Sequence, residues 1–173
     1  MKIINACFEL ENKEVFKGML ERIEKVGRTC YKSEDLITEE SAPKFVEMLI
    51  KRGHEAMVEH GGMISVRFIV DRGVSHELVR HRIASFAQES TRYCNYSKDK
   101  FGNDLTFIEP CFWKHGSNEY ATWFYEMERA ERTYLRLIEL GAQAQEARSV
   151  LPNSLKTEIV LSAIQENGET SLS

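Results

Sequence analysis

The chain has 173 residues, of which 42% are hydrophobic and 29% are charged, and its formal net charge at pH 7 is −4. This length favours one domain with its own core, and the acidic balance argues against a nucleic-acid binder, which needs a basic surface to contact the phosphate backbone. No stretch reaches the apolar length of a membrane span, and the N-terminus lacks the apolar region of a signal peptide. We therefore expect a single cytoplasmic domain over residues 1–173 with no membrane partner.

The first half of the chain is predicted to alternate strands and helices. Alternating apolar residues predict a strand over 2–8, and apolar residues at helical spacing predict a helix over 12–26. A second helix is expected over 41–53, because the glycine at its end readily takes the left-handed conformation that closes a helix. The β-branched and aromatic run at 63–70 predicts a buried strand, followed by a short helix from about Val74.

The second half is predicted to be mostly helical. A short strand is expected over 104–109, and a long amphipathic helix over 117–140 carries aromatic and aliphatic residues at i, i+3, i+4, i+7 spacing. Such a stripe is more often core or subunit interface than a cofactor contact, so we assign no chemistry to it. A further short helix is predicted over 144–151, whereas residues 154–163 fit either a strand or a helix.

The densest group of reactive and charged side chains lies at residues 80–93, which read RHRIASFAQESTRY and contain three arginines, a histidine, two serines, a threonine and a tyrosine. The planar guanidinium of arginine matches phosphate and carboxylate oxygens, and hydroxyl groups add short-range donors to the same oxygens. A cluster of charges is usually a solvated surface, but this composition favours a site for phosphorylated ligands. Arg80 and Arg82 are two residues apart, so they serve two different ligands if a helix ends here.

Three other kinds of chemistry are disfavoured. Four of the five histidines lie between residues 54 and 81, but they are six apart in HEAMVEH and five apart in HELVRH, whereas a helical HExxH zinc site needs four. Arginines beside His81 would also repel a cation, so we expect no metal ion. Nucleophilic catalysis by Ser90 or Cys94 lacks a GxSxG turn, and a binder of single-stranded RNA that uses these arginines and Tyr93 conflicts with the acidic balance.

This segment resembles the signature of the flavin-dependent thymidylate synthases, which is Arg-His-Arg, two residues, Ser, four residues, Ser, one residue, Arg-Tyr. Every fixed position of the signature is filled, by Arg80, His81, Arg82, Ser85, Ser90, Arg92 and Tyr93. Seven positions in order are much more restrictive than a short glycine pattern. The resemblance extends from about Gly27 to Ala163 and includes the segments GRTCYKSED, RGHEAMVEH and ARSVLP. It implies an α/β (α+β) fold, with a mostly antiparallel central sheet flanked by helices.

The resemblance also implies an activity, the reductive methylation of deoxyuridine monophosphate (dUMP) to thymidine monophosphate (dTMP). In the family, FAD is the cofactor, NADPH is the reductant, and 5,10-methylenetetrahydrofolate is the carbon donor. The enzymes are methyltransferases that assemble as homotetramers with active sites between subunits. Arginines near the pyrimidine would stabilise negative charge that develops on the ring, as an oxyanion hole does. A second hypothesis is a protein of the same fold that binds nucleotide and flavin with impaired turnover.

Roles for individual residues follow from the same resemblance. Cofactor contacts are expected from His54, Ala56, Arg80, His81, Arg82 and Gln88. Contacts with dUMP are expected from Glu77, Leu78, Val79, Arg80, Gln88, Glu89, Ser90, Thr91, Arg92 and Arg148. Ala87 stands where asparagine is common in the family, and Gln88 where a glutamate occurs. No catalytic residue is assigned, because the arginine that ionises the uracil is expected beyond residue 163.

The C-terminal end departs from the family pattern. After LPNSLKTEIVLSA the family continues with Asn-x-Arg-Glu-Trp-Arg, whereas this chain reads IQENGETSLS. A shift of one base near codon 163 would restore the family's segment, so we expect a truncated or frameshifted chain in which residues 164–173 are a frayed or non-native tail. A DNA sequence at codon 163 that cannot give the alternative reading would refute the frameshift.

Overall fold

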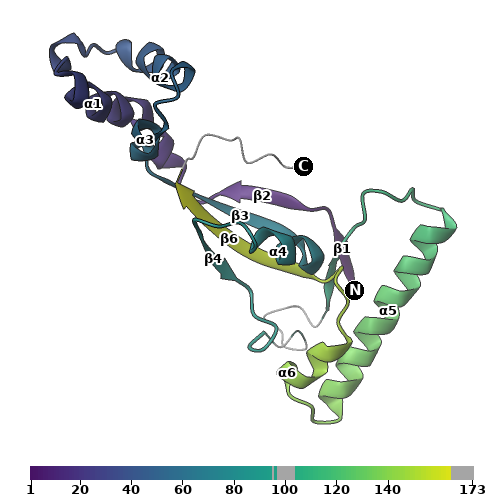
Figure 1. Cartoon of the computed structure of the whole chain (residues 1–173). Coiled ribbons are helices and arrows are strands. Elements are labelled where there is room, and N and C mark those ends of the chain that lie inside the picture. The colour runs from purple at the N-terminus through teal and green to yellow at the C-terminus, as the bar shows by residue number, and fades with distance from the viewer. Residues whose placement is uncertain (95, 97–103, 165–173) are drawn as a thin grey trace. The chain divides into compact units, whose positions relative to one another are not determined.

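The structure is a computed structural model that describes residues 1–94, 96 and 104–164 (Figure 1). The chain divides into two compact units. The first contains residues 1–9, 67–82 and 86–160, and the second contains residues 10–66, 83–85 and the described residues from 161 onward. The expectation of one domain over residues 1–173 stays a prediction, and each unit is described by itself.

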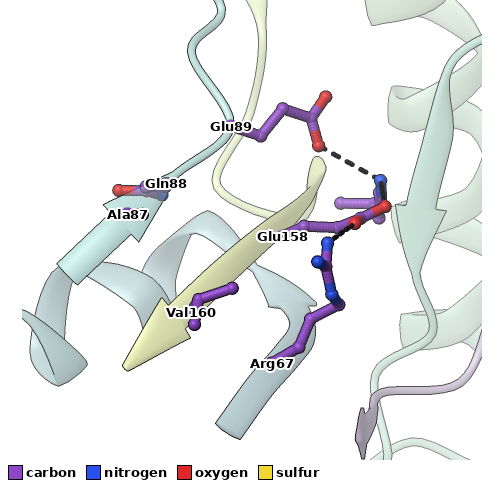
Figure 2. A pocket seen from close by; sticks show the side chains of 7 residues that line it. Arg67, Ala87, Gln88, Glu89, Glu158 and Val160 are labelled. Carbon is purple, nitrogen blue, oxygen red and sulfur yellow. Dashed lines mark hydrogen bonds and ion pairs between the residues drawn. The ribbon is translucent and has the colours of Figure 1, made fainter. Parts of the chain in front are cut away.

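A four-stranded sheet has the strand order β2-β3-β6-β4. Its strands are β2 (Cys7–Leu10), β3 (Met63–Asp71), β4 (Ala84–Gln88) and β6 (Lys156–Ile164). Ser65 Oγ lies 2.7 Å from Ser162 Oγ, and Arg67 NH1 lies 2.9 Å from Glu158 Oε2, so rising residue numbers on β3 meet falling numbers on β6. The arrows of β4 and β6 also point in opposite directions in Figure 2. The predicted antiparallel sheet is therefore confirmed.

A separate two-stranded sheet lies in the first unit. In it, β1 (Lys2–Ile4) pairs in parallel with β5 (Thr106–Ile108), and Ile3 lies opposite Phe107. The strand predicted at 104–109 is confirmed. The single strand predicted over 2–8 is wrong, because the chain leaves the β1–β5 sheet after Ile4 and enters the four-stranded sheet at Cys7.

The core of the first unit is formed between the β1–β5 sheet and the long helix α5 (Asn118–Glu139). Its buried residues are Tyr96, Leu105, Phe107, Trp123, Met127, Tyr134, Ala147 and Leu155. The helix begins where predicted, because the Ser117 hydroxyl accepts a hydrogen bond from the Tyr120 N–H at 3.2 Å. The aromatic stripe is confirmed as core at the buried residues Trp123 and Tyr134. A short helix α6 (Ala144–Ala147) and the 3₁₀ turn η5 (Arg148–Val150) follow, as predicted for this region.

The second unit packs α1 (Met19–Tyr31), α2 (Ser41–Lys51) and α3 (Glu55–Val58) side by side (Figure 1). Its core consists of Met19, Ile23, Phe45, Val46, Leu49 and Val58. Short 3₁₀ turns lie between these helices or beside them, at η1 (Lys13–Phe16), η2 (Glu34–Leu36) and η3 (Glu59–Gly61). The helix predicted over 12–26 begins later, at Met19, because Gly18 has a φ of 73° and interrupts the helical path.

The end of α2 carries the glycine that the sequence predicts. Gly53 has a φ of 68°, its N–H donates to the Ile50 carbonyl at 3.0 Å, and the His54 N–H donates to the Leu49 carbonyl at 3.0 Å. These two hydrogen bonds form a Schellman motif, which satisfies carbonyls that the helix end leaves unpaired. His54 is consequently fixed just beyond the end of α2.

The predictions for the segments that surround the signature or pair with it have different outcomes. The helix expected near Val74 is α4 (Arg72–Leu78), which begins where Asp71 Oδ1 accepts a hydrogen bond from the Val74 N–H at 2.7 Å. The segment that fitted either a strand or a helix is strand β6. Strand β4 was not predicted. The tail predicted over 164–173 stays a prediction: Ile164 ends β6, and the other residues of the tail lie outside the described residues.

Within the part of the chain that the structure describes, no helix is long and apolar enough to cross a membrane.

Candidate functional site

The first half of the signature forms the turn between α4 and β4. The Arg80 N–H donates to the Glu77 carbonyl at 3.0 Å and the His81 N–H donates to the Leu78 carbonyl at 3.1 Å, so the chain makes a tight turn directly after the helix. Arg80, His81 and Arg82 are all exposed. Arg80 NH1 lies 3.7 Å from Glu77 Oε2, but both side chains are 76% exposed, so this ion pair is weak. Helix α4 thus ends before Arg80. This is the condition under which Arg80 and Arg82 are predicted to serve two different ligands.

The turn also contains a strained backbone position. Ile83 has a φ of 62°, although it is β-branched, and it is 69% exposed. A side chain branched at Cβ rarely adopts this left-handed region, because Cβ then approaches the following carbonyl. Strain of this kind collects at functional sites and persists only where the surrounding structure holds it. Ile83 directly follows Arg82, so the strain lies inside the signature.

The second half of the signature forms a loop after β4. The N–H groups of Tyr93 and Cys94 donate to the Ser90 carbonyl at 3.1 and 3.0 Å, and the Arg92 N–H donates to Ser90 Oγ at 3.3 Å. These bonds close a compact turn. The resemblance assigned residues 88–92 to dUMP, and residues 90–92 lie in this turn.

Arg148 is brought to this loop from a distant part of the sequence. Its NH1 donates to Thr91 Oγ1 at 3.4 Å, although the two residues are 57 positions apart, and its Nε donates to the Gln145 carbonyl at 3.2 Å. Thr91 is buried, whereas Arg148 is exposed at the end of α6. The structure therefore groups Arg148 with the loop, as the resemblance implied.

Two arginines of the signature, Arg82 and Arg92, have exposed side chains. Among the described residues, neither Arg82 nor Arg92 has an acidic side chain within ion-pair distance, and both are exposed. The Arg92 guanidinium lies 5.6 Å from the centre of the Tyr93 ring. Exposed guanidinium groups without a carboxylate partner are suited to phosphate oxygens, which makes this donor set compatible with nucleotide and dinucleotide ligands.

Gln88 points its amide into the protein. Its Nε2 donates to Ser75 Oγ at 2.8 Å and to Thr157 Oγ1 at 3.2 Å, and both hydroxyl residues are fully buried. These bonds connect β4 to α4 and β6. The contacts of Gln88 with cofactor and dUMP stay predictions, and the same amide has the structural task of fixing the end of β4.

A pocket of about 520 Å³ lies beside the same loop. It is lined by Arg67, Ala87, Gln88, Glu89, Lys156, Glu158 and Val160 (Figure 2). Lys156 Nζ lies 3.1 Å from Glu89 Oε2 and 2.5 Å from Glu158 Oε1, and Arg67 NH1 lies 2.9 Å from Glu158 Oε2. Two bases and two acids neutralise one another here, so this pocket has no excess positive charge for a phosphate group. The signature arginines do not line it.

The protonation states of this cluster follow from its contacts. Burial by itself would lower the pKa of Lys156, but its hydrogen bonds and ion pairs with Glu158 and Glu89 outweigh burial and raise it. The hydrogen bond from Lys156, with help from Arg67, lowers the pKa of Glu158 against the opposing effect of burial. Burial and the neighbouring Glu89 charge raise the pKa of Tyr96, whose hydroxyl therefore stays a donor. Lys156 and Glu158 are therefore both charged at neutral pH.

The remaining predicted residues lie on two different units. Glu77 and Leu78 form the last turn of α4, and Val79 follows it, in the first unit. His54 and Ala56 belong to the second unit and are exposed. His54 Nδ1 lies 3.1 Å from the hydroxyl of Tyr31, which holds the imidazole ring beside α1. The roles of all these residues stay predictions.

Sequence reasoning missed the charged cluster. Lys156 and Glu158 are two residues apart, which puts both side chains on the same face of a strand. The sequence did not show whether this segment is a strand or a helix, so the spacing alone could not place the two side chains together. Arg67 is hidden in the same way within the run MISVRFIV. Among residues 1–94, 96 and 104–164, no three histidine, cysteine, aspartate or glutamate side chains group together as metal ligands would.

Comparisons with known proteins identify related sequences and a related fold. A profile of the family described as thymidylate synthase complementing protein matches residues 13–163. The flavin-dependent thymidylate synthase of Geobacter sulfurreducens is 28% identical over 141 residues, covering 78% of this chain and 59% of that protein. The corresponding protein of Pyrococcus furiosus is 30% identical over 135 residues, covering 78% of this chain and 54% of that protein. The chain thus spans about half the length of the curated relatives it matches.

A solved structure shares the fold. The UMP/dUMP methylase PolB from Streptomyces cacaoi, bound with 5-Br dUMP, superimposes with a TM-score of 0.70 over 95% of this chain and 75% of that chain. The two sequences are 20% identical, so the likeness shows the fold alone. The expected mixed fold of helices and a mostly antiparallel sheet is confirmed.

Proposed function

This chain belongs to the family of thymidylate synthase complementing proteins, and on that premise we propose that it acts in the flavin-dependent methylation of dUMP to dTMP. The observation that carries the proposal is the meeting of Arg148 with the Ser90–Arg92 turn across 57 residues of sequence. A turn that joins two hydroxyl groups to two arginines has the donors that a nucleotide phosphate needs.

The turn is assigned to the phosphate of dUMP. Ser90, Thr91 and Arg92 come from the signature, and Arg148 joins them from the end of α6. Because Arg92 has no acidic partner among the described residues, its charge is available to a phosphate dianion. Phosphate held here would leave the pyrimidine to extend toward the flavin, and guanidinium groups near the ring would stabilise negative charge on it.

The turn after α4 is assigned to FAD. Arg80, His81 and Arg82 are exposed there, and arginine donors suit the two phosphates of a dinucleotide. Bound FAD would supply the redox chemistry of the methylation, with NADPH as reductant and methylenetetrahydrofolate as carbon donor. His54 and Ala56 are proposed as further flavin contacts. A homotetramer with active sites between subunits and a cytoplasmic location belong to the same proposal.

The test begins with ligand binding by the purified chain. FAD is added, the visible absorption spectrum is recorded, dUMP is added, and dTMP formation is then measured with NADPH and methylenetetrahydrofolate. We expect a bound-flavin spectrum that changes with dUMP, followed by dTMP. Binding of both ligands without dTMP would favour the alternative of a protein with impaired turnover, and binding of neither would refute the proposal.

Two variants and one control localise the phosphate contact. Arg92→Gln and Arg148→Gln each remove one charged donor, which is worth about 1.5–3 kcal/mol, so dUMP affinity should fall roughly 10- to 100-fold. Arg129→Gln is the matched control, because Arg129 is 72% exposed on α5 and pairs only loosely, at 3.7 Å, with Glu126. If Arg92→Gln and Arg148→Gln bind dUMP as tightly as the control Arg129→Gln does, the assignment of the turn to the phosphate is contradicted.

A further inference from the structure

Glu89 is an acidic residue within a loop assigned to an anion. A carboxylate that faced the phosphate of dUMP would repel it. The structure gives the Glu89 carboxylate protein partners of its own. Both Gln88 and Glu89 line the pocket of Figure 2, but the Gln88 amide bonds Ser75 and Thr157, whereas the Glu89 carboxylate bonds Lys156 and Tyr96. The two neighbouring side chains therefore have different surroundings.

Both carboxylate oxygens of Glu89 have a protein donor. Lys156 Nζ lies 3.1 Å from Oε2, and the Tyr96 hydroxyl donates to Oε1 at 2.9 Å. The side chain of Glu89 is only 14% exposed and that of Lys156 only 20%. A carboxylate with this degree of burial needs such partners, because an unpaired charge in the interior is strongly unfavourable.

The contacts of Glu89 tie the loop to three other elements. Lys156 is on β6 and continues through Glu158 to Arg67 on β3. Tyr96 packs against Tyr134 of α5, with ring centres 5.9 Å apart. The Glu89 N–H also donates to the Glu158 carbonyl at 2.8 Å. Glu89 is thus fixed by its backbone and by both oxygens directly before the Ser90–Arg92 turn.

We propose that Glu89 is a positioning residue held by Lys156 and Tyr96, which orients the Ser90–Arg92 turn for a nucleotide phosphate without touching the nucleotide. This inference rests on the proposed function and replaces the expectation that Glu89 contacts dUMP directly. Lys156 neutralises the one acid of the loop, so the loop keeps a positive charge toward the ligand. On this proposal, the binding of the dUMP phosphate depends on Lys156 and Glu89, whereas the binding of the uracil base does not.

The first experiment needs no ligand. Amide hydrogen exchange is measured for Glu89, Tyr93 and Cys94, whose N–H groups all donate within this region, in the wild type, Lys156→Met, Lys156→Arg and Glu89→Gln. We expect exchange to be at least 10-fold faster in Lys156→Met and in Glu89→Gln, and close to the wild-type rate in Lys156→Arg, which keeps the charge. Lys51→Met is the matched control, since its ion pair with Glu47 is exposed.

The second experiment measures affinity for dUMP and for deoxyuridine, which lacks the phosphate. Lys156→Met should bind dUMP about 10-fold more weakly and deoxyuridine as the wild type does. The proposal would be overturned if Lys156→Met folds and its amides exchange at the wild-type rates. It would also be overturned if Glu89→Gln loses dUMP affinity while its amide exchange rates stay at the wild-type values, because Glu89 would then be a direct ligand. A wild type that binds no dUMP would refute the proposed function, while the exchange rates still decide the positioning role.

Discussion

The buried ion pair between Glu24 and Arg28 gives the sharpest test of how the second unit is held together. Glu24 is 1% exposed and Arg28 is 9% exposed. Arg28 Nε and NH2 each lie 2.8 Å from Glu24 Oε1, and the Ser41 hydroxyl donates to Oε2 at 2.9 Å. The Arg28 guanidinium also lies 4.5 Å from the centre of the Phe45 ring. The pair thus joins α1 to the first turn of α2.

Arg28→Met removes one partner and leaves a buried carboxylate with only the Ser41 hydroxyl. Breaking a buried pair in this way costs about 3–5 kcal/mol, which is a large part of the roughly 5–15 kcal/mol that stabilises a typical domain. The double variant Glu24→Leu with Arg28→Met removes both charges, so no uncompensated charge remains. We therefore expect the double variant to be more stable than Arg28→Met alone.

The assay is urea unfolding at pH 7, followed by far-UV circular dichroism. Lys51→Met, which breaks an exposed pair of the same i,i+4 spacing, should change the free energy of unfolding by less than about 0.5 kcal/mol. Both tryptophans, Trp113 and Trp123, lie in the first unit, so their emission reports whether that unit unfolds at the same urea concentration. Arg28→Met within about 1 kcal/mol of the wild type, or a double variant less stable than the single one, would refute the reasoning.

Three further predictions concern backbone strain and pH. Ile83→Gly should raise the free energy of unfolding by up to about 1 kcal/mol, because glycine accepts the φ of 62° without strain and little buried surface is lost; a lower melting temperature would contradict this. Gly53→Ala should cost about 1 kcal/mol, since no atom lies within 4 Å of the added Cβ and only the φ of 68° opposes it; an unchanged urea midpoint would argue against strain. The hydrogen bond from Lys156 lowers the pKa of Glu158 in the folded protein below its ordinary value of 4.5. The ionised Glu158 therefore contributes its full stability above pH 4.5, and this contribution is lost as the pH falls through the lower folded-state pKa. Glu158→Gln should flatten the drop in melting temperature between about pH 5 and 3, and equal slopes in both proteins would sink the assignment.

Local signals predicted the helices whose ends depend on a single residue. Ser117 marks the start of α5 because its hydroxyl caps the first turn, and Gly53 marks the end of α2 because it takes a left-handed conformation. Gly18 takes a left-handed conformation too, so α1 begins at Met19 rather than near the predicted residue 12. The break between β1 and β2 had no local signal, since residues 2–8 satisfy strand periodicity in either sheet.

Two strands of the site, β4 and β6, could not be predicted from periodicity. Residues 154–163 combine β-branched residues with helix formers, and only their pairing with β3 and β4 selects a strand. Hydrogen bonds in a sheet join distant segments, so a strand's identity depends on partners that its own sequence does not contain. Strand β4 has only five residues, ASFAQ, so its own pattern is too short to mark a strand, and its place beside β6 decides it.

The sequence by itself identified the family of this protein and predicted an anion site, because the signature is contiguous and its donors are intrinsic to arginine, serine and threonine. Only the tertiary structure shows which atoms of distant residues contact one another. Arg148 meets Thr91 across 57 residues, Lys156 meets Glu89 across 67, and Arg67 meets Glu158 across 91. Such contacts depend on strand register and helix packing, where a shift of one residue turns a side chain to the other face of the sheet.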